Sequence, residues 1–220
     1  MRSTIKLLSL AAALAGLLAL AVGPAHATTV GAVLGMNRGG ISGDAPPDAE
    51  YNGKTGLIAG LQTEFAIARD VSLSLQPMYV LRGSGITVAD STAENDERDL
   101  ELAFDYVAVP VVVKISAAGG RTYVAGGLDF AFLSAATLSD GDADRDVKEA
   151  FHDLDVGALL GFGVVFPIGR PRLTVEARYV MGLVNLSGGV EGVETPNLPD
   201  RFRSTGMQLT AGILFPLGRP

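Results

Sequence analysis

The stretch TGLIAGLQTEFAIARDVSLSLQPMYVLR, residues 55–82, decides the fold. Apolar residues alternate with small or polar ones in both halves, Thr55–Ala68 and Val71–Arg82, so each half is predicted as a β-strand. Ala68-Arg69-Asp70 leaves room only for a short turn, which predicts an antiparallel hairpin. One face of the hairpin carries Leu57, Ala59, Leu61, Thr63, Phe65, Ile67, Val71, Leu73, Leu75, Pro77, Tyr79 and Leu81. The opposite face mixes glycine, serine, glutamine and charged residues.

The same alternation continues along the chain and predicts eight strands. The segments are Thr28–Arg38, Thr55–Ala68, Val71–Arg82, Glu101–Ile115, Thr122–Ser134, Leu154–Phe166, Arg172–Leu186 and Gly206–Phe215. Soluble strands usually have ~5–6 residues, whereas a tilted strand needs ~9–11 to cross a bilayer. Each segment has roughly 10–15 residues, so strand length favours a membrane barrel. The fourth segment is apolar on both faces, and its orientation stays open.

The connections alternate strictly between short and long. Short turns are predicted at Ala68–Asp70, Ser116–Arg121 and Pro167–Pro171. Long linkers are predicted at Gly39–Lys54, Gly83–Leu100, Ala135–Asp153 and Ser187–Thr205. This alternation is typical of bacterial outer-membrane barrels, whose periplasmic turns are short and whose external loops are long. An internal repeat, GVVFPIGRP at Gly163–Pro171 and GILFPLGRP at Gly212–Pro220, closes two strands that run toward the predicted periplasmic rim.

The first residues are predicted to be a cleavable signal peptide. Arg2 and Lys6 precede an apolar run from Leu7 to Val22, and Ala25-His26-Ala27 is a small-x-small cleavage site. We expect residues 1–27 to be removed and residues 28–220 to form one barrel domain; a retained anchor is the alternative. Removal would leave 15 basic and 24 acidic residues, a net charge of −9. That charge argues against a nucleic-acid partner.

Further composition narrows the class. The chain has no cysteine, which excludes a small secreted fold held by disulfides. Hydrophobic residues make up 48%, yet after the signal no apolar run reaches the ~18 residues of a spanning helix. In hydrocarbon only helices and closed sheets satisfy every backbone group. The fold predicted is therefore all-β, an eight-stranded antiparallel up-and-down transmembrane β-barrel in the cell outer membrane, surrounded by its lipid.

Eight strands leave an interior that side chains fill. The inward faces offer a polar network of structural character, in which we expect Glu64 and Glu176 to pair with Arg82 and Arg178 across the lumen, because an unpaired charge there costs several kcal/mol. An unpaired, hydrated position near the rim is the alternative. The complete predicted network is Gln62, Glu64, Gln76, Arg82, Asp155, Glu176, Arg178 and Gln208.

The ordered series of strand motifs resembles the PorT-type outer-membrane β-barrel family, among the small OmpA-like and OmpX-like barrels. LSLQPMYVLRGSG at Leu73–Gly85 and FDYVAVPVVVK at Phe104–Lys114 carry the likeness most specifically. Two departures are Met78, where members often carry an acidic residue, and the five residues that follow Phe215. The resemblance implies an integral outer-membrane protein, often termed porin-like, that the barrel-assembly machinery inserts. It implies no single activity.

Catalytic and metal chemistry finds little support. His152 beside Asp153 is the single histidine after the signal, and no G-x-S-x-G motif accompanies it, so we expect no enzyme activity. Asp140–Asp146 has carboxylates at calcium-loop spacing, but Arg145 and Phe151 stand where a calcium loop needs glycine and glutamate. We expect no cofactor and no dedicated metal site.

Three functions follow from this fold. The first is a structural or surface-interaction barrel with a filled lumen and no wide channel, whose external partner the sequence does not name. The second is a pore or transport-related barrel for small solutes, which the strand count disfavours. The third is a soluble secreted barrel of the lipocalin type, whose apolar face would point inward.

Overall fold

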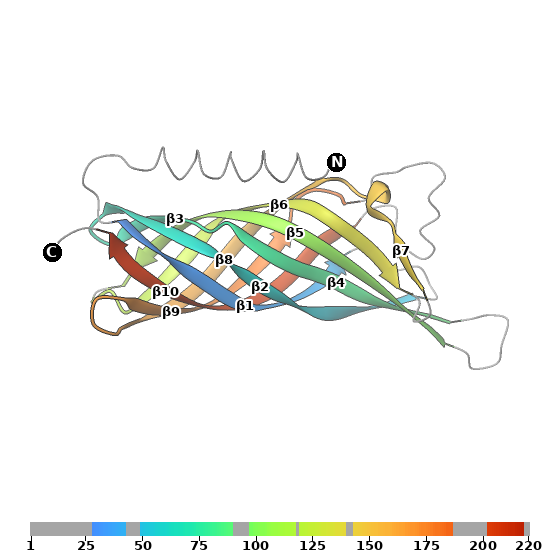
Figure 1. Cartoon of the computed structure of the whole chain (residues 1–220), viewed down its shortest axis with the longest axis horizontal. Coiled ribbons are helices and arrows are strands. Elements are labelled where there is room, and N and C mark those ends of the chain that lie inside the picture. The colour runs from blue at the N-terminus through green and yellow to red at the C-terminus, as the bar shows by residue number, and fades with distance from the viewer. Residues whose placement is uncertain are drawn as a thin grey trace.

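The computed structural model describes residues 28–42, 49–89, 97–117, 119–139, 143–186 and 202–217. The expected signal peptide, residues 1–27, and its cleavage site lie outside these residues. Within them, one twisted antiparallel sheet closes on itself (Figure 1). No helix in these ranges is long and apolar enough to cross a membrane.

The sheet contains the eight predicted strands, one of them in two pieces, and one short addition. The strands are β1 (Thr28–Ser42), β2 (Ala49–Ala68), β3 (Val71–Leu75), β4 (Met78–Ala89), β5 (Glu97–Ser116), β6 (Thr122–Ser139), β7 (Asp144–Asp146), β8 (Leu154–Pro167), β9 (Arg172–Gly182) and β10 (Arg203–Leu217). A single 3₁₀ turn, η1 (Lys148–Ala150), follows β7. β3 and β4 together correspond to the third predicted strand.

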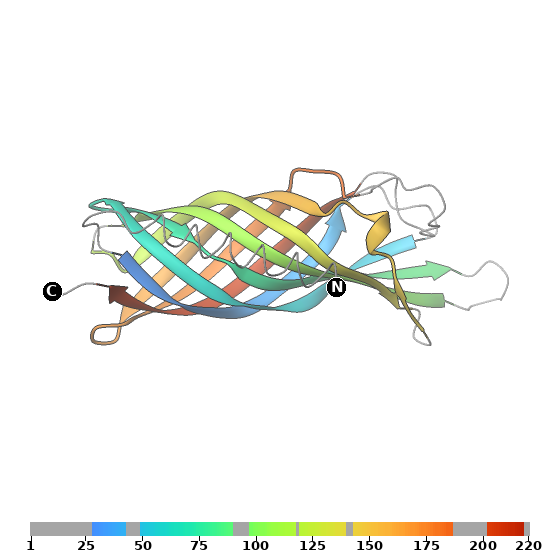
Figure 2. The same cartoon turned by 45° about the horizontal axis from the view of Figure 1, so that its top comes forward.

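The ring closes between its first and last strands. β1 pairs with β10 from Thr28↔Leu217 to Ser42↔Arg203, and with β2 on its other side. Every remaining neighbour is also antiparallel, so the wall of the barrel has no open edge. The expectation of an all-β up-and-down barrel with about eight strands in a ring is confirmed (Figure 2).

The break between β3 and β4 comes from a proline. Pro77 has no backbone N–H, so it cannot donate to a ladder. The surrounding backbone stays paired: the Leu61 N–H donates to the Pro77 carbonyl at 2.9 Å, and the Gln76 N–H donates to the Pro110 carbonyl at 3.1 Å. The wall is therefore continuous past the interruption.

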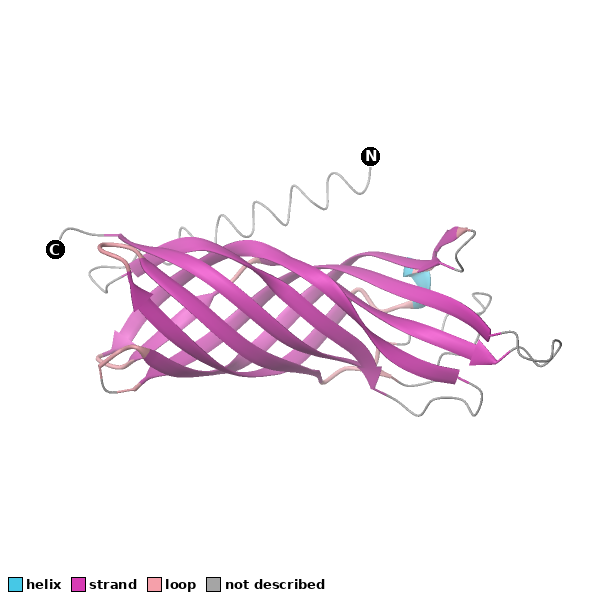
Figure 3. Ribbon diagram, turned by 90° about the horizontal axis from the view of Figure 1, so that it is seen from below, coloured by secondary structure: helices cyan, strands magenta, loops and turns pink. Residues whose placement is uncertain are grey.

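Several strands extend farther than the sequence predicts. β4 and β5 remain paired from Met78↔Ala108 to Ala89↔Glu97, so much of the predicted linker Gly83–Leu100 is strand. The backbone pairing continues beyond the point where apolar residues stop alternating with polar ones. A prediction based on that alternation therefore ended these strands too early. In contrast, β9 ends at Gly182, four residues before the predicted end. Figure 3 shows the extensions projecting from the end of the barrel opposite the short turns.

The two faces of the wall have opposite character. Large apolar side chains point outward, among them Leu160, which is 72% exposed, and Met207, which is 65% exposed. This arrangement is the reverse of a lipocalin-type barrel, whose outer surface is polar. The orientation of the fourth predicted strand is now settled, because Phe104, Tyr106 and Val112 on β5 are buried inside.

Candidate functional site: the filled lumen

All eight residues predicted for the lumen lie on the inner face of the barrel. Seven are buried, and the Glu64 side chain, near the short-turn end, is 15% exposed. They come from β2, β4, β8, β9, β10 and, for Gln76, the break between β3 and β4. They divide into two groups with different partners.

The first group centres on Arg82 of β4. Its Nη1 donates to Asp155 Oδ2 at 2.9 Å, and its Nη2 donates to Asp129 Oδ2 on β6. The Ser204 hydroxyl donates to Asp155 Oδ2 at 2.5 Å, and the guanidinium lies 5.0 Å from the centre of the Tyr106 ring. The expected pairing of Arg82 with Glu64 or Glu176 is therefore wrong, since the stagger of the strands brings Asp129 and Asp155 to Arg82.

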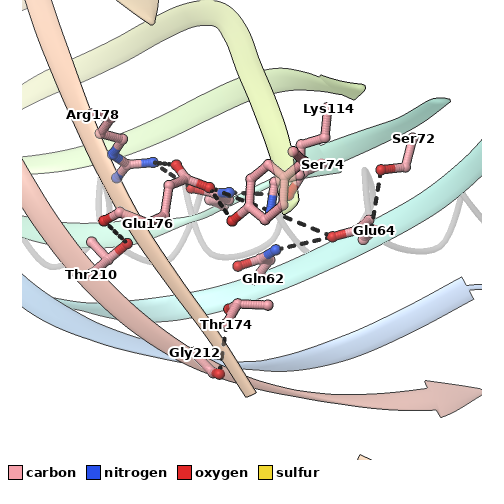
Figure 4. Close-up of polar contacts among 12 residues, drawn as sticks. Gln62, Glu64, Ser72, Ser74, Lys114, Thr174, Glu176, Arg178, Thr210 and Gly212 are labelled. Carbon is pink, nitrogen blue, oxygen red and sulfur yellow. Dashed lines mark hydrogen bonds and ion pairs between the residues drawn. The ribbon is translucent and has the colours of Figure 1, made fainter. Parts of the chain in front are cut away.

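The second group is a chain of alternating charge that runs toward the short-turn end. Arg178 Nη1 lies 3.6 Å from Glu176 Oε1, and Glu176 Oε2 lies 3.5 Å from Lys114 Nζ. Lys114 Nζ is also 3.5 Å from Glu64 Oε2, and Glu64 Oε1 is 3.9 Å from Arg172 Nη2. The chain joins β9, β5 and β2 across the lumen (Figure 4). Of the expected pairs, the structure contains that between Glu176 and Arg178, but these side chains lie two residues apart on β9, so the pair does not cross the lumen as predicted.

Neutral groups surround this chain. The Tyr123 hydroxyl donates to Glu176 Oε2 at 2.7 Å, and Lys114 Nζ lies 4.6 Å from the centre of the Tyr123 ring. Gly163 leaves the space for that ring, because a Cβ there would lie 2.2 Å from Tyr123 Cζ. A small residue on β8 therefore allows an aromatic residue of β6 to fold over the charges.

The predicted glutamines form further hydrogen bonds with Arg178 and Glu64. Arg178 Nε donates to Gln208 Oε1 and Nη1 donates to Gln76 Oε1, both at 2.6 Å. Gln62 Nε2 donates to Glu64 Oε2 at 3.3 Å. These bonds connect β9 to β10 and to the β3–β4 break. In the described residues, one carboxylate oxygen each of Asp129, Asp155 and Glu176 is buried without a hydrogen-bond donor.

The members of the network that were absent from the predicted set are Lys114, Asp129, Tyr123, Tyr106, Arg172 and Ser204. Lys114 was missed because β5 is apolar on both faces. A charged lysine on the lipid face of a barrel is destabilising, and this rule favours an inward side chain for the single lysine of such a strand. Asp129 and Tyr123 share the inward parity of β6, so alternation placed them on the right face. The alternation could not show that Asp129 would contact Arg82 or that Tyr123 would contact Glu176.

The end of the lumen opposite the short turns is closed by apolar side chains. The Phe104 and Phe151 rings meet edge to face at 4.9 Å, and Phe151 meets Phe202 at 6.0 Å. We call these three residues the aromatic cap. Phe151 directly follows η1, which is tied to the wall by a hydrogen bond from the Val147 N–H to the Ala136 carbonyl at 3.0 Å. The aromatic cap packs in the same buried cluster as Leu133 and Leu186.

Two small cavities lie beside the charged groups of the lumen. A cavity beside Arg82 and Tyr106 offers a water-sized particle about 10 Å³, and one beside Lys114 and Arg172 offers about 30 Å³. A water molecule needs roughly 10–15 Å³ of such space. Each of these two cavities therefore has room for isolated waters.

The two sequence features weighed for chemistry lie near the cap. His152 is exposed, and its backbone N–H donates to the Leu186 carbonyl at 3.1 Å. Asp144–Asp146 of the acidic loop forms β7 and pairs with β6, whereas residues 140–142 lie outside the described ranges. In the described ranges, no three His, Cys, Asp or Glu side chains gather where they could hold a metal ion.

A closed antiparallel barrel with an apolar outer face and a filled polar lumen defines an integral membrane β-barrel. The sequence matches the family described as "Outer membrane protein beta-barrel domain" over residues 23–188, and the chain belongs to that family. Its place is accordingly the outer membrane. No curated protein matches the sequence.

Several solved structures resemble the chain at low sequence identity. Neisserial surface protein A, from Neisseria, is 12% identical, with a TM-score of 0.46 over 86% of this chain and 97% of that one. Ail of Yersinia pestis is 13% identical, with a TM-score of 0.44 over 85% and 98%. OprG of Pseudomonas aeruginosa is 9% identical, with a TM-score of 0.46 over 89% and 97%.

Proposed function

We propose that this protein is a structural or surface-interaction barrel of the outer membrane and that no solute passes through it. The observation that carries the proposal is the filling of the lumen. From the short-turn end, the alternating chain, the Arg82 group and the aromatic cap succeed one another along the axis, and the two cavities beside the charged groups have room for isolated waters. A pore is accordingly not favoured.

The charge of the connections supports an interaction role for the long-loop end. The four linkers Gly39–Lys54, Gly83–Leu100, Ala135–Asp153 and Ser187–Thr205 contain 17 acidic and 6 basic residues, a net charge of −11. The three short turns carry a net charge of +2. Acidic connections of this length suit a solvated recognition surface, and loops commonly carry binding residues. The strong negative charge of this surface limits its partner to a molecule that can bind an acidic surface.

Finer assignments extend this proposal. We propose that residues 1–27 are a signal peptide, that the barrel is PorT-like and lacks enzyme activity, and that the barrel-assembly machinery inserts it. The alternation of Met207, Leu209, Ala211, Ile213 and Phe215 at the end of the last strand supports insertion by that route. The lumen network then has a structural role, as a plug.

Electrical recording tests the proposal. The refolded protein is added to a planar lipid bilayer under voltage, with a porin in the same set-up as the positive control. We expect no stepwise current from this protein. Reproducible unitary steps that increase with protein concentration would contradict a sealed lumen and favour the pore.

A further inference from the structure

Each described short turn carries one exposed arginine. Arg69 lies between β2 and β3, Arg121 between β5 and β6, and Arg170 between β8 and β9. These turns gather at one rim of the barrel, at the end where β1 begins and β10 ends (Figure 1). With Asp70 as the one acidic residue of the three turns, the rim is positive while the opposite end is strongly negative.

The backbone holds these arginines at defined places. The Ser116 N–H donates to the Asp70 carbonyl at 2.8 Å, and the Val165 N–H donates to the Arg121 carbonyl at 2.7 Å. The first two turns are thereby bonded to the adjacent strand of the wall, and the third is closed by a bond from the Ile168 N–H to the Pro171 carbonyl at 3.1 Å. Gly169, directly before Arg170, has a φ of +88°, a conformation that L side chains rarely adopt. The backbone from which each arginine projects is therefore held in a defined position.

Large apolar side chains on the outer wall flank every arginine. Ile67 is exposed two residues before Arg69, Val124 is exposed three residues after Arg121, and Phe166 and Ile168 are exposed just before Arg170. Such positions belong in hydrocarbon, so each arginine stands where hydrocarbon ends and lipid headgroups begin. The long arginine stem lets the guanidinium reach the headgroup level.

The internal repeat has the same construction twice. In FPIGRP an exposed aromatic residue, Phe166, and an exposed aliphatic residue, Ile168, precede Gly-Arg-Pro. In FPLGRP the corresponding residues Phe215 and Leu217 are also exposed on the outer wall. A shared pattern of apolar anchors followed by arginine indicates a common task at the membrane interface.

We propose that the short-turn rim binds the headgroups of anionic phospholipids. The guanidinium group forms paired hydrogen bonds with phosphate oxygens, which distinguishes it from a simple positive charge. Apolar anchors beside each arginine would hold the acyl chains while the guanidinium holds the phosphate. Arginines spaced around one rim would collect a ring of such lipids and fix the depth of the barrel in that leaflet.

Lipid selectivity at the barrel surface tests the proposal. The protein is refolded in phosphatidylcholine vesicles with and without phosphatidylglycerol, and spin-labelled lipids report the relative affinity of the surface for each. We expect a preference for phosphatidylglycerol of up to about fivefold for each arginine, reduced by high salt. The triple variant R69Q/R121Q/R170Q should lower the ratio toward one.

Matched controls separate this rim from general electrostatics. The variant R145Q/K148Q removes two charges from the segment of β7 and η1 at the opposite end, which carries no exposed large apolar side chain, and should keep the wild-type ratio. Inorganic phosphate should reduce the preference no more than chloride at equal ionic strength, since the site recognises lipid. An equal ratio in wild type and the rim variant, or displacement by phosphate alone, would overturn the proposal. Single variants, each lowering the ratio in part, cover the case in which the triple variant fails to fold.

Discussion

At the scale of single residues, Arg82 is the most demanding position in the lumen. Its guanidinium is in direct contact with two buried carboxylates, Asp129 and Asp155. Replacement by methionine would leave both without compensation, and we expect a loss of about 3–5 kcal/mol in the free energy of unfolding. Chemical unfolding in vesicles, followed by tyrosine fluorescence, measures the loss.

Arg172→Gln is the matched control, because the Arg172 side chain is 39% exposed and its ion pair with Glu64 is partly screened. We expect it to cost less than about 1 kcal/mol. Replacing Arg82, Asp129 and Asp155 together by apolar residues of similar volume should recover most of the stability. Losses of equal size for the Arg82 and Arg172 variants would count against the buried cluster as a source of stability.

Residue by residue, alternation predicted which side chains face inward but not which ones meet. Gln76, Glu176 and Arg178 were placed on the inner face by counting, since a β-strand has a period of two. The partner of Arg82 depends on how far β4, β6 and β8 are staggered around the ring, and no local pattern in the sequence carries that information. The choice of Asp129 over Glu64 could therefore be seen only in three dimensions.

At the scale of elements, Phe151 anchors the segment containing β7 and η1 to the end of the barrel. Its ring contacts Phe104 on the wall and Phe202 before β10. We expect Phe151→Ser to release this segment while the barrel below stays folded, because truncating a buried phenylalanine costs about 3–5 kcal/mol. Hydrogen exchange at the Val147 amide should become much faster, and exchange at the Val112 amide within β5 should not change.

His152→Ala is the control for the cap, since His152 is the exposed neighbour of Phe151. It should leave the exchange of Val147 at the wild-type rate. Unchanged exchange in Phe151→Ser would mean that backbone pairing of β7 with β6 holds the segment without help from the cap. The sequence predicted a long linker here, Ala135–Asp153, because the apolar residues that anchor it lie too far apart to form a period.

At the scale of the whole molecule, the barrel depends on closure between β1 and β10. Ala211 lies in the middle of β10, opposite Leu34 of β1 and Val175 of β9. Proline at 211 would remove a ladder N–H where lipid offers no substitute, so we expect Ala211→Pro to prevent the ring from closing. Leu217→Pro is the control, because it lies at the last pair of the ladder, next to Pro216, which the strand already accommodates.

A folded barrel and a boiled chain migrate differently in electrophoresis, and that shift measures the folded fraction. The shift should vanish for Ala211→Pro and persist for Leu217→Pro. Full folding of both variants would mean that the wall tolerates an open seam, which a bilayer-spanning sheet cannot do if every backbone group must be paired within the protein.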